Sequence, residues 1–451
     1  MARFVLALLV MMLGLPISAA VPHIKALSAT DAVLLAVRLH PNVQHAQLDR
    51  VLDRFTLAIA NNAFMPQYQL SGVSQWATGV KPAQSGTASV SVKAPWGTRV
   101  SVSKTLQKDG DDTNLVVSQP MLRGLGAVNR IQLDNAQDQM TLGRLSLSDT
   151  LMSVINRALT SYWALIQAEQ DLKVRQLSLD QTRAILKAYS IKVKIGQMAR
   201  ANLLQQKTAL LQGQLEYRAQ LNTIQTAQHN LKVALGLSPD ASIHIVHDLN
   251  KLKHLKLPTL DESIRQALAH NVGYLKHQLS MHSLARGILS AEDAQRWQLD
   301  AEGQWSAKHH WQTDLKLSIP IHDLTRQQQL VSARVAYRQA QLQLEQARRQ
   351  LISDVKINWD HCRSQLEQIR LAQQTVKLTY KDYQLAQRAR LAGINSTYEV
   401  IAQQEKWVEA QLQLSALKIG YLNTLISFHQ QLGTTLSLWK IHLNHFEARL
   451  T

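Results

Sequence analysis

The longest uninterrupted segment of this chain contains neither glycine nor proline between Ile321 and Ala392. Apolar residues recur there at spacings of three and four, for example at Val355, Trp359, Cys362 and Leu366. That spacing is typical of one face of an α-helix, and glycine and proline are the residues that interrupt helices. The segment therefore predicts one amphipathic helix of about 68 residues, roughly 100 Å long at a rise of about 1.5 Å per residue.

The chain also contains an internal duplication. Gly393 and Gly433 follow Gly196 and Gly236 at one common separation, because 393 minus 196 and 433 minus 236 are both 197. Long stretches rich in Gln, Ala and Leu precede both members of each pair. Self-similarity at a fixed distance predicts one structure made of two similar halves. Each half is expected to hold a long helical hairpin that turns at a glycine.

The first half repeats the long helix from about Val128 to Ile195, with only Gly143 as an internal glycine. Return helices are predicted at about 199–235 and 396–432, which is half that length. Shorter helices at 31–63 and 261–295 could be stacked end to end with the return helices to match the long ones. Such packing predicts a cylinder of helices.

Between the helices the pattern changes to alternation, which is typical of strands. The predicted strands lie within 67–119 in the first half and within 298–321 in the second half. In the last strand Leu315, Leu317 and Ile319 alternate with polar Asp314 and Lys316. Such a strand separates core from solvent in a globular sheet, or lipid from lumen in a membrane barrel. Tryptophans near the strand ends fit either ordinary sheet packing or an interfacial girdle: Trp76, Trp96, Trp305 and Trp311.

The N-terminus predicts export. Arg3 is followed by an apolar run from Phe4 to Leu15 and by small residues that end at Ala20, which is typical of a cleaved signal peptide. The apolar run is too short for a membrane span, which needs about 20 residues. Cys362 is the only cysteine, so no internal disulfide can form, and we expect a small buried side chain.

The net charge of +17 does not by itself indicate a nucleic-acid partner. The basic residues are spread along helices among Gln, Asp and Glu, whereas nucleic-acid binding predicts a dense basic patch or a reading motif.

The chain is predicted to divide into a signal peptide (1–20), a first repeat (21–236), a linker (237–257), a second repeat (258–436) and a tail (437–451).

Two sets of residues carry a family resemblance. The run Ser118-Gln119-Pro120-Met121-Leu122-Arg123-Gly124, with Asn129 close behind, resembles the strand-to-helix junction in a branch of the TolC family of outer membrane efflux proteins. Arg390-Leu391-Ala392-Gly393 and Lys194-Ile195-Gly196 are similar to the hairpin turns of that family. The order of helices and strands, given twice, extends the resemblance over nearly the whole mature chain.

The resemblance implies a mainly α fold with membrane β-barrel strands. Each protomer of a homotrimer would supply four strands to a 12-stranded outer membrane barrel and two helical hairpins to a periplasmic tunnel. It implies an exit duct of a tripartite efflux pump or a type I secretion system, with a periplasmic adaptor, an inner membrane transporter and outer membrane lipid as partners. No cofactor is implied. The strand pair at Thr87 to Lys104 exceeds the four-strand plan, and an external hairpin is one way to place it.

The hairpin tips are the candidate docking surface for the adaptor. We assign to it Gly196, Arg200, Arg390, Gly393 and Ser396. Both glycines are also expected to end a helix in a left-handed conformation.

Position matching with the family places Glu399 and Ala402 where two acidic residues often line the tunnel mouth. Glu399 is the one acid retained, and the equivalent residue of the first half is neutral Asn202. Three copies of Glu399 would form a negative ring that favours cations. The alternative is a helix-start glutamate stabilised by the helix dipole. Asn395 stands where some members have a latching arginine, so a latch is not predicted here.

No catalytic motif is present, and we predict that the protein is not an enzyme. His309-His310, His244 with His247, and His361-Cys362 lack further ligands at metal-binding spacing, which favours structural roles. The competing class is a periplasmic coiled-coil adaptor or scaffold, which ordinarily has one hairpin rather than two. Passive diffusion through a porin is disfavoured by the amount of helix.

Overall fold

The computed structural model describes residues 24–76, 83–107, 110–246, 257–307, 310–392 and 396–447. The predicted signal peptide and Gly393 lie outside these residues, as do residues 247–256 of the predicted linker. The chain divides into two compact units, which are described separately. Unit one comprises 1–39, 158–255 and 383–415, and unit two comprises 40–157, 256–382 and 416–451. Each unit draws segments from both predicted repeats, whose boundaries stay a prediction.

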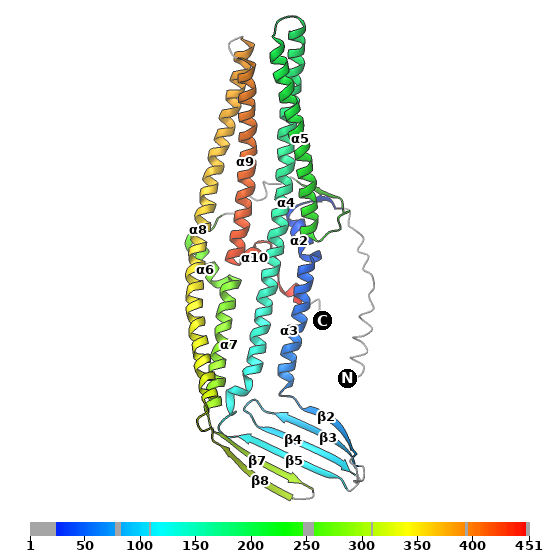
Figure 1. The fold of residues 1–451 in the computed structure, drawn as a ribbon, viewed down its shortest axis with the longest axis vertical. Helices are drawn as coiled ribbons and strands as arrows, with labels where there is room; N and C mark the ends of the chain where they lie inside the picture. Colours follow the sequence, from blue (N-terminus) through cyan, green and yellow to red (C-terminus); the bar gives the residue numbers. More distant parts are fainter. Residues whose placement is uncertain are drawn as a thin grey trace. The chain divides into compact units, whose positions relative to one another are not determined.

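The four long helices follow the sequence pattern closely (Figure 1). They are α4 (Ile131–Lys194), α5 (Arg200–Leu235), α8 (Leu324–Leu391) and α9 (Thr397–Leu432). Helix α8 has 68 residues without a break, as predicted. The predicted start of the first long helix at Val128 belongs instead to a short 3-10 helix, η1 (Gly126–Arg130), directly before α4.

The remaining helices are shorter. They are α2 (Ala29–Leu39), α3 (Pro41–Asn62), α6 (Leu260–His270), α7 (Val272–Gln295), α10 (Thr435–Leu438) and α11 (Asn444–Glu447). Ser28 caps α2, because its hydroxyl accepts from the Asp31 amide at 3.2 Å. Helix α6 is capped by Thr259, whose hydroxyl accepts from the Glu262 amide at 3.4 Å. The sequence predicts the start of this helix at residue 261, one residue after its observed first residue, Leu260.

His40 caps α3 with its ring. The Asn42 amide donates to His40 Nδ1 at 3.2 Å, so the cap requires that nitrogen to be unprotonated. Burial, and secondly the positive charge of Arg157, lowers the pKa of His40 below its ordinary value of 6.5. The neutral ring therefore stabilises the fold fully above pH 6.5, and this stabilisation is lost as the pH falls through the lowered pKa.

We expect acidification from pH 7.5 to 5 to remove about 1 kcal/mol of capping stabilisation from the wild-type protein. His40→Asn keeps a cap acceptor that does not titrate, so its unfolding free energy should depend less on pH. His229→Asn, at an exposed position of α5, is the matched control and should behave as wild type. Chemical denaturation at several pH values measures the effect. Equal pH dependence of His40→Asn and wild type would contradict the assignment.

Unit two contains one antiparallel six-stranded sheet (Figure 1). Its strands are β2 (Gln67–Gln75), β3 (Ala83–Lys93), β4 (Arg99–Gln107), β5 (Asp112–Pro120), β7 (Gln298–Ser306) and β8 (His310–Ser318), in the order β2-β3-β4-β5-β7-β8. The prediction of four strands per protomer is therefore wrong. An external hairpin, one of the ways to place the extra strand pair, does not fit either, because β3 and β4 pair with neighbours on both sides.

The sheet has one apolar and one polar face, because side chains alternate along each strand and the register aligns them across all six. We define the apolar face by the residues Tyr68, Leu70, Ala88, Val90, Val92, Val100, Val102, Leu106, Leu115, Val117, Leu299, Ala301, Trp305, Trp311, Leu315 and Leu317. Lys104 is the charged exception. The polar face carries mainly Ser, Thr, Gln and charged residues, including an ion pair of Lys316 with Glu302 at 2.7 Å.

Exposed tryptophans lie at both ends of the strands. Trp76 follows the end of β2 and Trp311 lies at the start of β8, and these two strand ends lie at the same end of the sheet along the strand direction. Trp96 and Trp297 lie at the opposite end of the strands, where the sheet connects to the helices. All four are more than half exposed in the single chain.

The helical part of unit two has a small core between α6, α8 and α9. Its buried residues are Ala267, Leu351, Val355, Cys362, Phe428 and Leu432. Cys362 is fully buried, and burial raises the pKa of its thiol to about 11. The predicted role of Cys362 as a small buried side chain is confirmed.

Gly143 gives α4 room for a buried arginine. Arg50 of α3 donates to the Met140 carbonyl at 2.6 Å and pairs with Asp53 at 3.1 Å. A Cβ at Gly143 would collide with the Asp53 carboxylate and lie 2.6 Å from Arg50 Nη1. The glycine thus accommodates a charged contact against the helix backbone.

Unit one is built around the α4 segment that follows residue 157. The short strands β1 (Ile24–Leu27) and β6 (Ile243–Ile245) pair in parallel, a feature that the sequence did not indicate. The Tyr162 hydroxyl donates to the Val246 carbonyl at 2.8 Å beside this pair. Trp163 and Tyr189 of α4 are fully buried in this unit.

Candidate docking surface at the hairpin ends

The first hairpin turns at a glycine-terminated helix end. Gly196 follows α4 with a φ of 75°, a left-handed conformation that favours glycine. The Gln197 amide donates to the Lys192 carbonyl at 2.8 Å, and the Gly196 amide donates to Val193 at 3.2 Å. These bonds satisfy carbonyls that the helix end leaves open. Arg200, the first residue of α5, is exposed.

The second hairpin starts its return helix differently. The Ser396 hydroxyl accepts from the Glu399 amide at 3.3 Å and caps α9. At the equivalent position of α5, Ala199 makes no side-chain cap. Glu399 is half-buried, and its Oε1 accepts from Gln403 Nε2 at 2.7 Å. The two hairpin ends are therefore alike in order of elements and different in capping chemistry.

Arg390 links the two hairpins within unit one. Its guanidinium lies 5.7 Å from the ring centroid of Tyr189 of α4, and Nη1 donates to the Tyr189 hydroxyl at 3.3 Å. Tyr189 is fully buried. Cation–π contacts of this kind favour arginine over the face of an aromatic ring. Arg390 is thus held against a buried tyrosine, whereas Arg200 and Ser396 are exposed to solvent.

Aromatic packing also fixes the second hairpin near its end. The rings of Tyr383 in α8 and Trp407 in α9 stack at 5.6 Å with an interplanar angle of 9°. Gln387 donates to the Tyr383 hydroxyl at 2.5 Å. Sequence reasoning missed this pair because its members lie 24 positions apart on different helices.

A groove of about 790 Å³ runs between α4, α5 and α9 in unit one. Its walls are partly polar, with Arg175 bonded to Glu216 at 2.6 Å. Gln404 donates to the Ser178 carbonyl at 3.3 Å at its floor. Gln206 is 1% exposed, and its Oε1 has no hydrogen-bond partner among the described residues. The groove is a second candidate surface, and the mixture of apolar and polar residues that lines it gave no sequence signal.

Buried polar contacts continue between α4 and α9. The Ser415 hydroxyl donates to Gln170 at 3.3 Å. Burial raises the pKa of the neighbouring Asp171, against the opposing effects of Ser415, Arg175 and Gln167. This carboxylate lies in the helix packing and not at the hairpin ends.

The histidine pairs show no metal site in the described part of the chain. No group of three or more potential metal ligands is found there. His247 and His309 lie outside the described residues, and Cys362 beside His361 is buried.

Among the described helices, none is both long enough and apolar enough to cross a membrane.

Residues 289–434 match a family model described as outer membrane efflux protein. This part of the chain is similar to the outer membrane efflux protein domain. This domain covers the end of α7, strands β7 and β8, and helices α8 and α9. The resemblance to TolC-family proteins that the sequence predicts is confirmed. No curated protein gives a match.

Solved outer membrane proteins share the fold of about nine-tenths of this chain. The CmeC channel of Campylobacter jejuni has a TM-score of 0.67 at 13% identity, and the match covers 90% of this chain and 86% of the CmeC chain. VceC of Vibrio cholerae has a TM-score of 0.70 at 13% identity, with coverage of 90% and 96%. The open MtrE channel of Neisseria gonorrhoeae has a TM-score of 0.68 at 13% identity, with coverage of 90% and 89%. The predicted fold class is confirmed, with the strand number corrected as above.

Proposed function

We propose that the chain is a non-enzymatic outer membrane exit duct, assembled as a homotrimer, of a tripartite efflux pump or a type I secretion system. The observation that carries this proposal is the two-faced six-stranded sheet in a chain that also contains two long helical hairpins. The efflux protein domain at residues 289–434 supports it.

The sheet has the chemistry of a membrane barrel wall. Its strands have nine to eleven residues, which matches the length of about 9–11 residues that a tilted strand needs to cross a bilayer. The apolar face would contact outer membrane lipid and the polar face would line the lumen. Exposed tryptophans at both strand ends fit the two interfacial girdles of such barrels.

The hairpin ends are the proposed docking surface for a periplasmic adaptor, which in turn engages an inner membrane transporter. Gly196, Arg200, Gly393 and Ser396 form this surface, and the groove between α4, α5 and α9 extends it. Arg390 would act as a positioning residue, because its contact with Tyr189 ties the two hairpins together.

Localisation and assembly test the duct against the adaptor or scaffold alternative. The proposal predicts material in the outer membrane fraction that migrates as a trimer on mild detergent gels. Soluble periplasmic monomer would support the alternative and overturn the proposal.

Docking is tested by replacing both tip glycines with tryptophan. A strain lacking the chromosomal copy is first screened for loss of tolerance to dyes, antibiotics and metal salts. Gly196→Trp with Gly393→Trp should fail to restore that tolerance while outer membrane trimers remain. The control is Gly287→Trp in α7, where an added side chain meets nothing within 4 Å. Restored tolerance by the tip variant would refute docking at these glycines.

Glu399 is proposed to make the tunnel mouth cation-selective, as a ring of three carboxylates would. Glu399→Gln should lower the preference for cations over anions in planar-bilayer recordings, while Glu345→Gln, at an exposed position of α8, serves as the control. Unchanged selectivity would assign Glu399 to the alternative role of stabilising the start of α9.

A further inference from the structure

The strand pair β3–β4 lies fully inside the hydrogen-bonded sheet. Strand β3 is paired with β2 from Gln67↔Ser91 to Gln75↔Ala83. Its other side is paired with β4 from Ser85↔Gln107 to Lys93↔Arg99. Strand β4 is in turn paired with β5 from Arg99↔Ser118 to Thr105↔Asp112. Detaching this pair from the wall would break both outer ladders.

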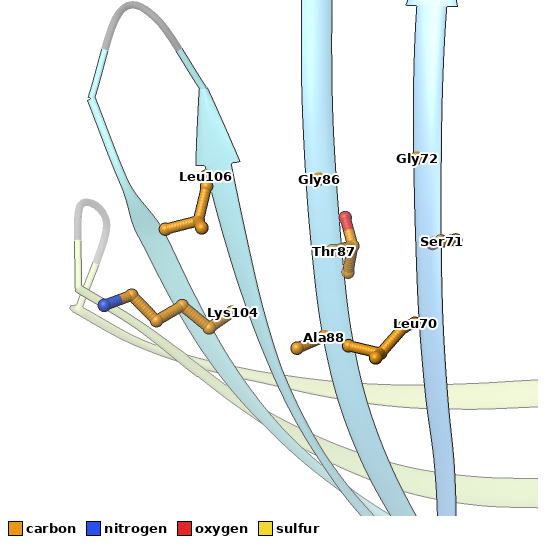
Figure 2. A pocket seen from close by; sticks show the side chains of 8 residues that line it. All are labelled: Leu70, Ser71, Gly72, Gly86, Thr87, Ala88, Lys104 and Leu106. Carbon is orange, nitrogen blue, oxygen red and sulfur yellow. The ribbon is translucent and has the colours of Figure 1, made fainter. Parts of the chain in front are cut away.

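The two strands also share the chemistry of the rest of the sheet. Val90 and Val102 face each other on the apolar face, and Ser89 and Ser103 face each other on the polar face. Figure 2 shows β2, β3 and β4 side by side, with Leu70, Ala88 and Lys104 on neighbouring strands. A hairpin exposed to water on both sides has no reason to segregate apolar from polar side chains in register with its neighbours.

A shallow hollow lies on these strands. Gly72 of β2 faces Gly86 of β3, and a Cβ at either position would meet nothing within 4 Å. Leu70 and Leu106 line the hollow, as Figure 2 shows. Lipid chains would fill such a hollow on an outward apolar face.

The β3–β4 turn is anchored at the strand-to-helix junction. The Gly126 amide donates to the Trp96 carbonyl at 2.9 Å, and the Thr98 hydroxyl bonds to the Gln119 side chain. Asn129 Nδ2 donates to the Gly124 carbonyl at 2.6 Å beside this turn. The Gln119 to Gly124 motif, with Asn129, therefore holds the inserted turn as well as starting α4.

Both edges of the sheet remain open to another copy. Within the described residues, neither β2 nor β8 has a strand on its outer side. Because the sheet has six antiparallel strands, β2 and β8 run in opposite directions, so β8 of one copy can pair antiparallel with β2 of the next. Both edge strands have nine residues. Closure of the ring removes edges that otherwise promote aggregation.

We infer that three copies close an eighteen-stranded barrel, six strands from each, in place of the twelve-stranded barrel that the sequence predicts. The inference rests on the proposed function, which supplies the outer membrane and the trimer. Barrel diameter grows about linearly with strand number, so this barrel is about 1.5-fold wider than a twelve-stranded one. Barrels of 16–18 strands are wide enough for an open aqueous channel.

Spin-label accessibility at adjacent positions of β3 tests the inference. Ala88→Cys and Ser89→Cys place a nitroxide on the apolar and the polar face of the trimer in liposomes. We expect the label at 88 to be relaxed by oxygen and not by a water-soluble nickel chelate, and the label at 89 to show the reverse. Leu315→Cys and Asp314→Cys on β8 are the matched pair and should give the same contrast.

The outcomes separate the two proposals. Absence of outer membrane trimers in the unsubstituted protein overturns both. Trimers in which labels at 88 and 89 are both reached by the nickel chelate overturn the eighteen-stranded barrel and leave the exit duct standing. Because a labelled variant could fail to assemble, the strands are also counted in a cryo-EM map of the unsubstituted trimer. Eighteen strands support the inference, and twelve with a detached hairpin overturn it.

Discussion

Replacing Gly433 with alanine should lower the free energy of unfolding by about 3 kcal/mol, because two costs add. Gly433 has a φ of 72°, and a residue with a Cβ costs about 1–2 kcal/mol in this conformation. The added Cβ would also collide with the His270 carbonyl oxygen and lie 2.6 Å from the carbonyl carbon. Backbone of the α6–α7 joint would have to move, which adds about 1–3 kcal/mol.

Gly196→Ala is the matched control for that experiment. Gly196 has almost the same φ, 75°, but an added Cβ there meets nothing within 4 Å. It should cost only about 1 kcal/mol. Denaturant unfolding of the solubilised protein and the yield of outer membrane trimers measure both variants. Equal losses for the two alanines would show that the collision at His270 is relieved without cost.

Replacing Gly97 with alanine should disrupt the β3–β4 turn, at a cost of about 3 kcal/mol. Gly97 has a φ of 113°, and an added Cβ would lie 2.5 Å from the Gly124 carbonyl oxygen. It would also lie 2.8 Å from Pro120 Cγ and 2.9 Å from Asn129 Nδ2. These atoms belong to the junction between β5 and α4, so the turn and the junction should be disturbed together.

Gly126→Ala isolates the collision from the backbone conformation. Gly126 has a φ of 83°, and an added Cβ there finds open space, while its amide still donates to Trp96. We expect trimers of Gly97→Ala to dissociate at a clearly lower temperature than those of Gly126→Ala on mild detergent gels. Indistinguishable dissociation temperatures would mean that the turn does not depend on the junction.

The sequence predicted the long helices well because their evidence is local. A segment free of glycine and proline with apolar residues every three or four positions has one regular structure available, and α8 and α9 begin and end within three residues of prediction. Local evidence offered no explanation for Gly143, because only the buried Arg50 on another helix accounts for it.

The number of strands per protomer was the main prediction from the sequence that was wrong, and the reason is physical. Alternation shows that a segment is a strand with two faces, but it does not show which strands are neighbours. The sequence predicts a strand pair at Thr87 to Lys104, and the four-strand plan of the family left no place for it in the barrel wall. The register of β3 against both β2 and β4 supplies the missing information.

The candidate docking residues were located by the turn glycines, and their contacts were beyond sequence reasoning. Arg390 was assigned to the surface because it precedes Gly393, but its partner Tyr189 lies 201 positions away. The groove between α4, α5 and α9 combines residues from three helices, each of which reads as an ordinary helix face. Gly393 itself lies outside the described residues, so its conformation stays a prediction.

The β3–β4 insertion also bears on how channels of this kind could diversify. A hairpin adds two strands at once, so β2 and β5 on either side of it keep opposite directions. The number of strand-to-helix connections is likewise unchanged, because β3 and β4 are joined to each other by a turn at residues 94–98. Insertion or loss of hairpins could therefore change the diameter of a barrel by two strands per copy while the helices connected to it stay unchanged.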